Sequence, residues 1–259
     1  MTRELSMMTY EEVRDYLAKG PGIIILPVGS TEQHGPHATM GIDTFATLAV
    51  SRPLAEELNA LIAPDLSYAV STPHRGWPGT IHIKPSTVTA LLVEIGTEIL
   101  AQGFKVLIMI TGHRGNEPAL KCALDEIPPK AGTHVLALAY QDANKGRMDV
   151  ILRKPKDQIL KEDMAYGSDG HGGSCECSLA MAERPECVHL DRRIVPDRTL
   201  IDLRRNLGLT AALPIDKYAT QGIFGDPSNI SLEYGKYLAA ETAKEIARRV
   251  RLYLKTFGG

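Results

Sequence analysis

Two short hydrophobic runs mark the most deeply buried parts of the chain. Residues 22–26 (GIIIL) and 104–110 (FKVLIMI) are rich in branched aliphatic side chains, and a loop containing glycine and histidine follows each of them. Hydrophobic runs of this length, without alternation of polar residues, are typical of strands that are covered on both faces. We therefore expect two central strands at these positions.

Segments with helical spacing alternate with strand-like segments. Hydrophobic residues recur every three or four positions over residues 44–59, 85–103 and 116–127, while residues 61–66 and 133–139 resemble strands. This alternation favours an α/β fold with a mainly parallel sheet and helices on both faces. The side chains expected on the inner face of the helix at 85–103 are Leu91, Leu92, Ile95, Ile99 and Leu100.

Both ends of the chain are predicted to be helical. Thr9 and Glu12 have the spacing of a capping box, in which each side chain binds a free amide at the start of a helix. Residues 231–254 have the pattern of a long amphipathic helix. Between Glu183 and this helix, the charged and irregular stretch to residue 215 is expected to form a solvated surface, a pocket cover or a subunit contact.

Potential metal ligands are concentrated directly after the first buried run. The segment 26–37 reads LPVGSTEQHGPH, and Asp43 follows six residues later. Glu32 and His34 are two positions apart, so their side chains point the same way on an extended segment. Carboxylate and imidazole ligands together suit Zn, Mn or Fe better than Ca or Mg. The alternative is a glycine- and proline-rich turn whose polar residues are only solvated.

The second buried run also ends in a loop with a potential ligand, His113. If the two strands are parallel neighbours in one sheet, both loops lie at its carboxyl edge, where open α/β sheets place their binding sites. This convergence makes His113 a candidate fourth ligand. It also favours a metal site over a merely solvated turn.

A third segment, residues 168–178 (SDGHGGSCECS), contains His171 and Glu176 as candidates to face the metal. A phosphate-binding turn is the weaker alternative, because the segment lacks the lysine of a P-loop. A thiolate zinc site would need a second cysteine pair, so Cys175 and Cys177 are expected to pack within a helix. The remaining histidines are expected to be structural, apart from two candidates for the pocket rim, His74 and His82.

Composition narrows the possible functions. The 259 residues are 44% hydrophobic and carry a net charge of −2, so we expect one domain over 1–259 and no binding of nucleic acid or anionic membranes. No stretch approaches the roughly 20 apolar residues of a membrane helix, and four cysteines are too few for a disulfide framework. These features indicate a soluble, cytoplasmic protein with reduced thiols.

Several motifs in a fixed order carry a resemblance to a known family. Residues 29–37 (GSTEQHGPH) with Asp43, then WPGT at 77–80, Gly112-His113 with Asn116, HGG at 171–173 with Glu176, and GDP at 225–227 resemble the creatininase (creatinine amidohydrolase) family. The resemblance implies a three-layer α/β fold, a two-metal hydrolase site and a homohexamer. By position it implies that one metal is held by Glu32 and the other by His34 and His113, with Asp43 bridging both.

The sequence also departs from the family's namesake. Creatininase has a ligating glutamate at the position of Gly115, so one metal would lose a ligand, and Glu176 is the candidate to replace it. His171 is then the candidate to protonate the leaving nitrogen or to orient the substrate, while Glu176 as general base is the alternative. Creatininase also clamps its substrate with tryptophans near the segment corresponding to His171. Here Trp77 is the sole tryptophan, so we expect a substrate other than creatinine.

These inferences predict a metal-dependent amidohydrolase with two divalent ions, preferably Zn, with Mn or Fe as alternatives. Its substrate would be a small polar molecule with a non-peptide C–N bond, such as a cyclic amide or a formamide. Relatives with the glycine-type pattern include formamide hydrolases, a peptidase of mycofactocin maturation and ring hydrolases of inositol catabolism. A ring hydrolase acting on an inositol-derived diketone is therefore one alternative. A non-catalytic metal-binding protein, which would close the metal's coordination shell with protein ligands, is another.

Overall fold

The structure, a computed structural model, describes residues 3–128, 130–143, 170–197, 199–200 and 213–258. Ser168 and Asp169 of the third candidate segment lie outside the described residues, as do residues 201–212 of the charged stretch. The expectation of a single domain stays a prediction.

A parallel four-stranded sheet forms the centre of the molecule, in the order β2-β1-β3-β4. The central strands β1 (Ile23–Val28) and β3 (Val106–Thr111) are fully buried, and β4 (His134–Ala139) and β2 (Leu61–Ile62) flank them. The register pairs Val28 with Thr111, so the carboxyl ends of β1 and β3 are level. The predicted parallel sheet is confirmed, although β2 is shorter than the expected strand at 61–66 because Pro64 has no amide to donate to a ladder.

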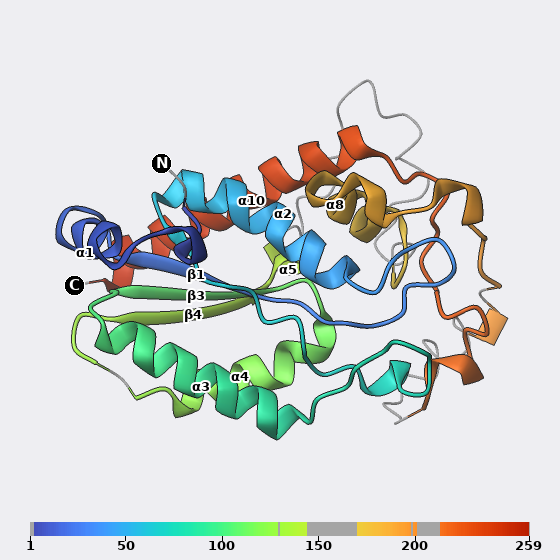
Figure 1. Cartoon of the computed structure of the whole chain (residues 1–259), viewed down its shortest axis with the longest axis horizontal. Helices are drawn as coiled ribbons and strands as arrows, with labels where there is room; N and C mark the ends of the chain where they lie inside the picture. The colour runs from blue at the N-terminus through green and yellow to red at the C-terminus, as the bar shows by residue number, and fades with distance from the viewer. Residues whose placement is uncertain (1–2, 129, 144–169, 198, 201–212, 259) are drawn as a thin grey trace.

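Helices cover both faces of the sheet, which confirms the three-layer α/β fold (Figure 1). One face packs against α2 (Ile42–Leu58), α8 (Ser174–Glu183) and α10 (Leu232–Phe257). The other face packs against α3 (Pro85–Ala101) and α4 (Glu117–Glu126). Further helical elements in the described ranges are α1 (Tyr10–Lys19), α5 (Tyr140–Ala143) and the 3-10 turns Leu5–Met7, Thr72–His74, Arg114–Asn116, Pro185–Cys187, Leu190–Arg192 and Ile215–Lys217.

Local sequence signals explain where most of these elements begin and end. Thr9 and Glu12 form the predicted capping box at the start of α1. The predicted inner face of α3 is wrong at Leu91, which is exposed, whereas Leu92 is fully buried. One position along a helix turns a side chain by about 100°, which carries Leu91 past the edge of the buried face while Leu92 stays within it.

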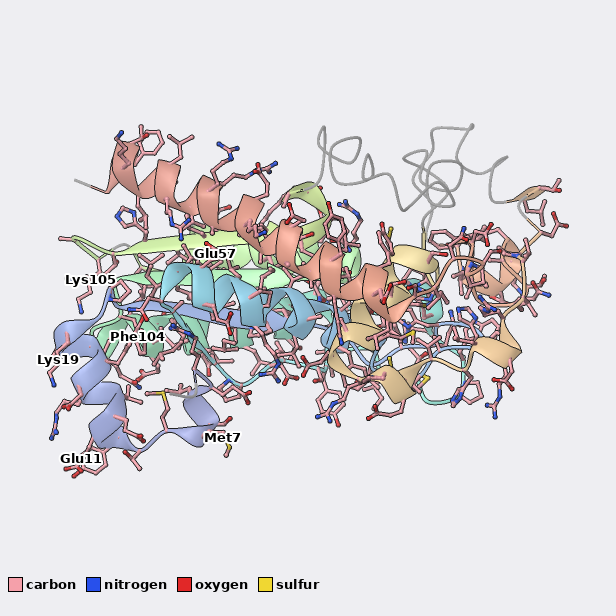
Figure 2. The ribbon with its side chains drawn as sticks, turned by 90° about the horizontal axis from the view of Figure 1, so that it is seen from above. Met7, Glu11, Lys19, Glu57, Phe104 and Lys105 are labelled. Atoms are coloured by element: carbon pink, nitrogen blue, oxygen red, sulfur yellow. The ribbon has the colours of Figure 1, made fainter. Side chains whose placement is uncertain are left out.

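The two ends of the sheet differ in what they hold. Lys105 directly precedes β3 and lies near α1, at the amino end of the strands (Figure 2). The carboxyl ends lead into the loops with the candidate ligands. None of the helices in the described part of the chain is long and apolar enough to cross a membrane.

We expect the substitution Gly235→Ala to destabilise the protein. A Cβ at Gly235 in α10 would overlap the backbone carbonyl of Ser178 in α8, which cannot rotate away. Overpacking costs about 1–3 kcal/mol, which exceeds the gain in helix propensity of at most about 1 kcal/mol. Urea unfolding should show a lower midpoint for Gly235→Ala, whereas the exposed neighbour Lys236→Ala should unfold like the parent chain. A midpoint for Gly235→Ala at or above that of the parent would contradict this packing.

Candidate metal centre

Candidate ligands from separate elements meet at the carboxyl edge of the sheet. Glu32 and His34 lie in the loop after β1, and Asp43 lies in the first turn of α2, which this loop enters. His113 lies two residues after the end of β3, and Glu176 lies in the first turn of α8. The structure thus brings together all of the metal ligands expected from the sequence. Glu32, His34 and Asp43 are each at most 1% exposed.

Asn116 braces the loops that hold these residues. Its buried side chain donates to the carbonyl of Gly29 at 2.8 Å and accepts a hydrogen bond from the amide of Val70 at 3.1 Å. It also donates to the hydroxyl of Thr111 at 3.2 Å. One amide side chain therefore joins the exits of β1 and β3 to the segment at residue 70. The sequence placed Asn116 at the start of a helix and in a motif with Gly112-His113, but it gave no sign that this side chain joins the loops.

Two of the three groups of candidate ligand atoms share Asp43. In one group, His113 Nδ1 lies 3.3 Å from Glu32 Oε1 and 3.2 Å from Asp43 Oδ2. In the other, His34 Nε2 lies 3.6 Å from Asp43 Oδ1 and 3.6 Å from Glu176 Oε2. The structure therefore places His113 with Glu32, whereas the resemblance implied that it shares a metal with His34. Glu176 occupies the place beside His34 instead.

Backbone carbonyls determine which imidazole nitrogens face the centre. His34 Nδ1 lies 3.0 Å from the carbonyl of Glu32, His113 Nε2 lies 2.6 Å from that of Val70, and His171 Nε2 lies 2.6 Å from that of Gln33. A carbonyl can only accept, so each of these nitrogens donates. The other nitrogen of each neutral ring then presents a lone pair to the carboxylates. Such outer hydrogen bonds are the usual way in which proteins orient histidine ligands.

This donor set fits a divalent metal. Both oxygens of Glu32 and the Nε2 atom of His34 are buried and have no hydrogen-bond partner among the described residues. Burial alone would lower the pKa of His113, but the charges of Glu32 and Asp43 outweigh it and raise that pKa to about 10. Without a metal, protons on the imidazoles therefore neutralise the buried carboxylates. Mixed oxygen and nitrogen ligands favour Zn, Mn or Fe over Ca or Mg.

His171 lies beside both groups. Its Nδ1 is 3.6 Å from Glu32 Oε1, and its ring centroid is 4.1 Å from that of His34. Burial and the neighbouring charge of His34 hold the pKa of His171 well below its usual value, so the ring is neutral. Glu32, His34 and His171 also form a third possible set of ligands, in line with the expectation that His171 faces the metal.

Two further residues belong to this centre. His74 was expected at the pocket rim, but it is 5% exposed and its Nε2 lies 3.4 Å from Glu32 Oε1. Gln33 lies between two ligands in sequence, and its side-chain nitrogen is 2.8 Å from His74 Nδ1. The signal for His74 was its loop at 72–82, whose glycines and prolines predicted a pocket-shaping segment. No sequence signal distinguished Gln33 from the other polar residues of its loop.

The cysteines take no part in this centre. Cys175 and Cys177 are buried in α8 as expected, with Cys175 Sγ 3.3 Å from the hydroxyl of Tyr234. None of the four cysteines forms a disulfide.

Comparisons with known proteins identify the family of this chain. The family model "Creatininase: Creatinine amidohydrolase" matches residues 6–250. Creatinine amidohydrolase of Pseudomonas putida is 30% identical over 197 residues, which cover 71% of this chain and 73% of the relative. The mycofactocin precursor peptide peptidase of Mycobacterium ulcerans is 28% identical over 240 residues, which cover 88% of this chain and 84% of the relative.

Solved structures show the same fold. A crystal structure of creatinine amidohydrolase is 25% identical, covers 99% of this chain and 98% of its own, and has a TM-score of 0.76. Solved creatininases also include a "Zn-Zn type" mutant, with 24% identity, a TM-score of 0.77, and coverage of 97% of this chain and 98% of its own. Because the family model spans nearly the whole chain, this protein is an enzyme of the creatininase family.

Proposed function

We propose that this enzyme hydrolyses the C–N bond of a small polar amide, such as a cyclic amide or a formamide, with the help of two divalent ions. The observation that carries the proposal is the position of Asp43, whose two oxygens lie in two separate groups of ligand atoms. Two ions bridged by one carboxylate are typical of metal-assisted hydrolysis. Zn is the preferred ion, with Mn or Fe as alternatives.

The two groups divide the ligands. Glu32, Asp43 and His113 would hold one ion, and His34, Asp43 and Glu176 would hold the other. Ions bound in this way supply Lewis-acid activation of a carbonyl group and of water. The geometry thus supports Glu176 as the carboxylate that replaces the ligand missing at Gly115.

Glu176 is well placed for this role. Its Oε2 accepts a hydrogen bond from the amide of Gly172 at 2.8 Å, and its position in the first turn of α8 lets the helix dipole stabilise its negative charge. An anchored carboxylate suits a ligand better than a general base that must move with a proton. The role of general base remains the alternative.

His171 is proposed to transfer the proton. Hydrolysis adds a hydroxyl to the carbonyl carbon and a proton to the nitrogen as the C–N bond breaks. The Nδ1 atom of His171 has a free lone pair because its Nε2 donates to the carbonyl of Gln33. A neutral imidazole in this position can take a proton from water and deliver it to the leaving nitrogen.

Two other classes of substrate are suggested by the relatives of this chain. A peptide amide is favoured by the mycofactocin precursor peptide peptidases, which match 88% of this chain. The ring of an inositol-derived diketone is suggested by 3-dehydro-scyllo-inosose hydrolase of Thermotoga maritima, although its 34% identity extends over only 118 residues. A homohexamer and a cytoplasmic location stay predictions.

A substrate panel tests the proposed activity. The Zn- or Mn-loaded enzyme should release product from cyclic amides or N-formyl compounds, and chelation should abolish that activity. Short peptides and cyclic diketones serve as the competing classes. Turnover confined to peptides would replace the small-amide proposal with the peptidase candidate. Stable metal binding without turnover of any class would favour a non-catalytic protein.

We expect Asp43→Ala to lose both ions. The shared carboxylate serves both groups, and its removal also leaves two cations without a charge between them. Elemental analysis after dialysis should find little metal in Asp43→Ala, about one ion in Glu32→Ala and a full complement in the exposed control Asp65→Ala. Two retained ions in Asp43→Ala would exclude a bridging role.

The variants Glu176→Gln and His171→Asn should separate binding from proton transfer. Glu176→Gln keeps the shape of the side chain but removes its charge, so it should weaken one ion selectively. His171→Asn should keep its metal while turnover falls about a hundredfold or more. The measurements are metal content and steady-state rate. Normal metal content in an inactive Glu176→Gln would make Glu176 the general base, and loss of metal from His171→Asn would make His171 a ligand.

A further inference from the structure

His74 differs from the other histidines around Glu32 in the hydrogen bonds that it makes. His34, His113 and His171 each donate one ring N–H to a backbone carbonyl and turn the other nitrogen toward the centre. The Nδ1 atom of His74 instead faces the side-chain nitrogen of Gln33 at 2.8 Å. The tautomer of His74 therefore depends on whether the Gln33 amide is oriented with its nitrogen toward this atom.

Backbone groups orient the Gln33 amide. Its Oε1 accepts a hydrogen bond from the amide of Gly35 at 2.9 Å, and its Nε2 donates to the carbonyl of Gly222 at 2.7 Å. A flipped amide would place two donors together at Gly35 and two acceptors together at Gly222. The observed orientation is therefore the only one that satisfies both backbone groups.

The second hydrogen of Gln33 Nε2 must then point to an acceptor. His171 Nε2 is 3.2 Å away, but that nitrogen already donates to the Gln33 carbonyl at 2.6 Å. His74 Nδ1 is the remaining neighbour, and it must accept. A ring that accepts at Nδ1 carries its hydrogen on Nε2, and this is the atom that lies 3.4 Å from Glu32 Oε1.

We propose that His74 is a positioning residue, which donates a hydrogen bond from Nε2 to the metal-binding carboxylate of Glu32 and is not itself a ligand. Gln33 keeps His74 in the donating tautomer. The inference rests on the proposed two-ion site, and it adds an outer hydrogen-bond network to that site. The network extends to Gly222, where a side chain would overlap the Gln33 amide.

This network gives the Glu32 carboxylate a donor in addition to the nearby hydroxyl of Ser71. No hydrogen bond of normal geometry reaches either Glu32 oxygen in the described part of the chain. His113 and His171 offer it lone pairs when neutral, so His74 is the neutral imidazole that offers a hydrogen. Ligating carboxylates usually have such outer partners, whose loss weakens metal binding about 10- to 100-fold.

Two variants of His74 test the proposal. In His74→Asn, the amide oxygen can replace Nδ1 as the acceptor for Gln33, but no donor reaches Glu32. In His74→Gln, the longer side chain places an amide nitrogen near the former Nε2. Competition with a chromophoric chelator for Zn²⁺ should show that His74→Asn binds one of two ions about 10- to 100-fold more weakly. His74→Gln should stay within about threefold of the parent chain.

The Co²⁺-substituted protein supplies a second readout, because its absorption bands report the ligand set. A donor role leaves these bands unchanged in both variants, whereas a ligand role shifts them. The matched control is His82→Asn, since His82 Nδ1 also accepts a hydrogen bond, from the amide of Ser71 at 3.0 Å. Its metal affinity should equal that of the parent.

Each other outcome contradicts the proposal. Shifted bands with weak binding in both variants would make His74 a ligand. If both variants bound the metal equally weakly with unchanged absorption bands, the role of His74 would be packing. If both variants kept the affinity of the parent, His74 would have no role in metal binding. Failure of the proposed two-ion site is distinguishable, because the parent chain itself would then not bind two Zn²⁺ ions, and failure of the proposed activity would appear only in the substrate panel.

Discussion

The strictest physical constraint on this structure is the burial of Glu32 and Asp43 side by side. Moving a carboxylate out of water costs several kcal/mol unless a positive charge compensates it. His34 and His113 provide that charge as protons when no metal is bound, which is why the carboxylates raise the pKa of both rings despite their burial. Metal ions and protons therefore compete for the same lone pairs, and metal binding must release protons.

The fold meets this constraint through the geometry of its sheet. Because β1 and β3 are parallel and level at their carboxyl ends, the loops that follow them emerge side by side. The amino ends of α2 and α8 supply Asp43 and Glu176 from one covering layer, and the dipole of each helix favours a negative charge there. The same strands form the hydrophobic core, so the packing that stabilises the protein also determines the spacing of the ligands.

Sequence patterns predicted the parts of this arrangement that depend on local signals. The continuous apolar runs located β1 and β3, and the parallel order then brought Glu32, His34, Asp43 and His113 to one edge. The partner of His113 could not be predicted, because it depends on rotations of side chains within loops. The same limit applies to His74, whose loop was recognised but whose distance from Glu32 depends on tertiary packing. The prediction that Leu91 faces the core was wrong for a simpler reason, since the adjacent Leu91 and Leu92 fit the helical periodicity equally well.

The ligands and the residues around them come from different parts of the chain. The ligands lie next to the sheet and in the first turns of two helices, while the aromatic surroundings of His171 come from a separate cluster in which Trp77 and Phe224 pack on Ile215, Tyr218 and Ala219. Such peripheral segments tolerate change better than central strands. A change confined to this cluster can therefore alter the surroundings of His171 while the strand ends and helix starts that carry the candidate ligands stay in place.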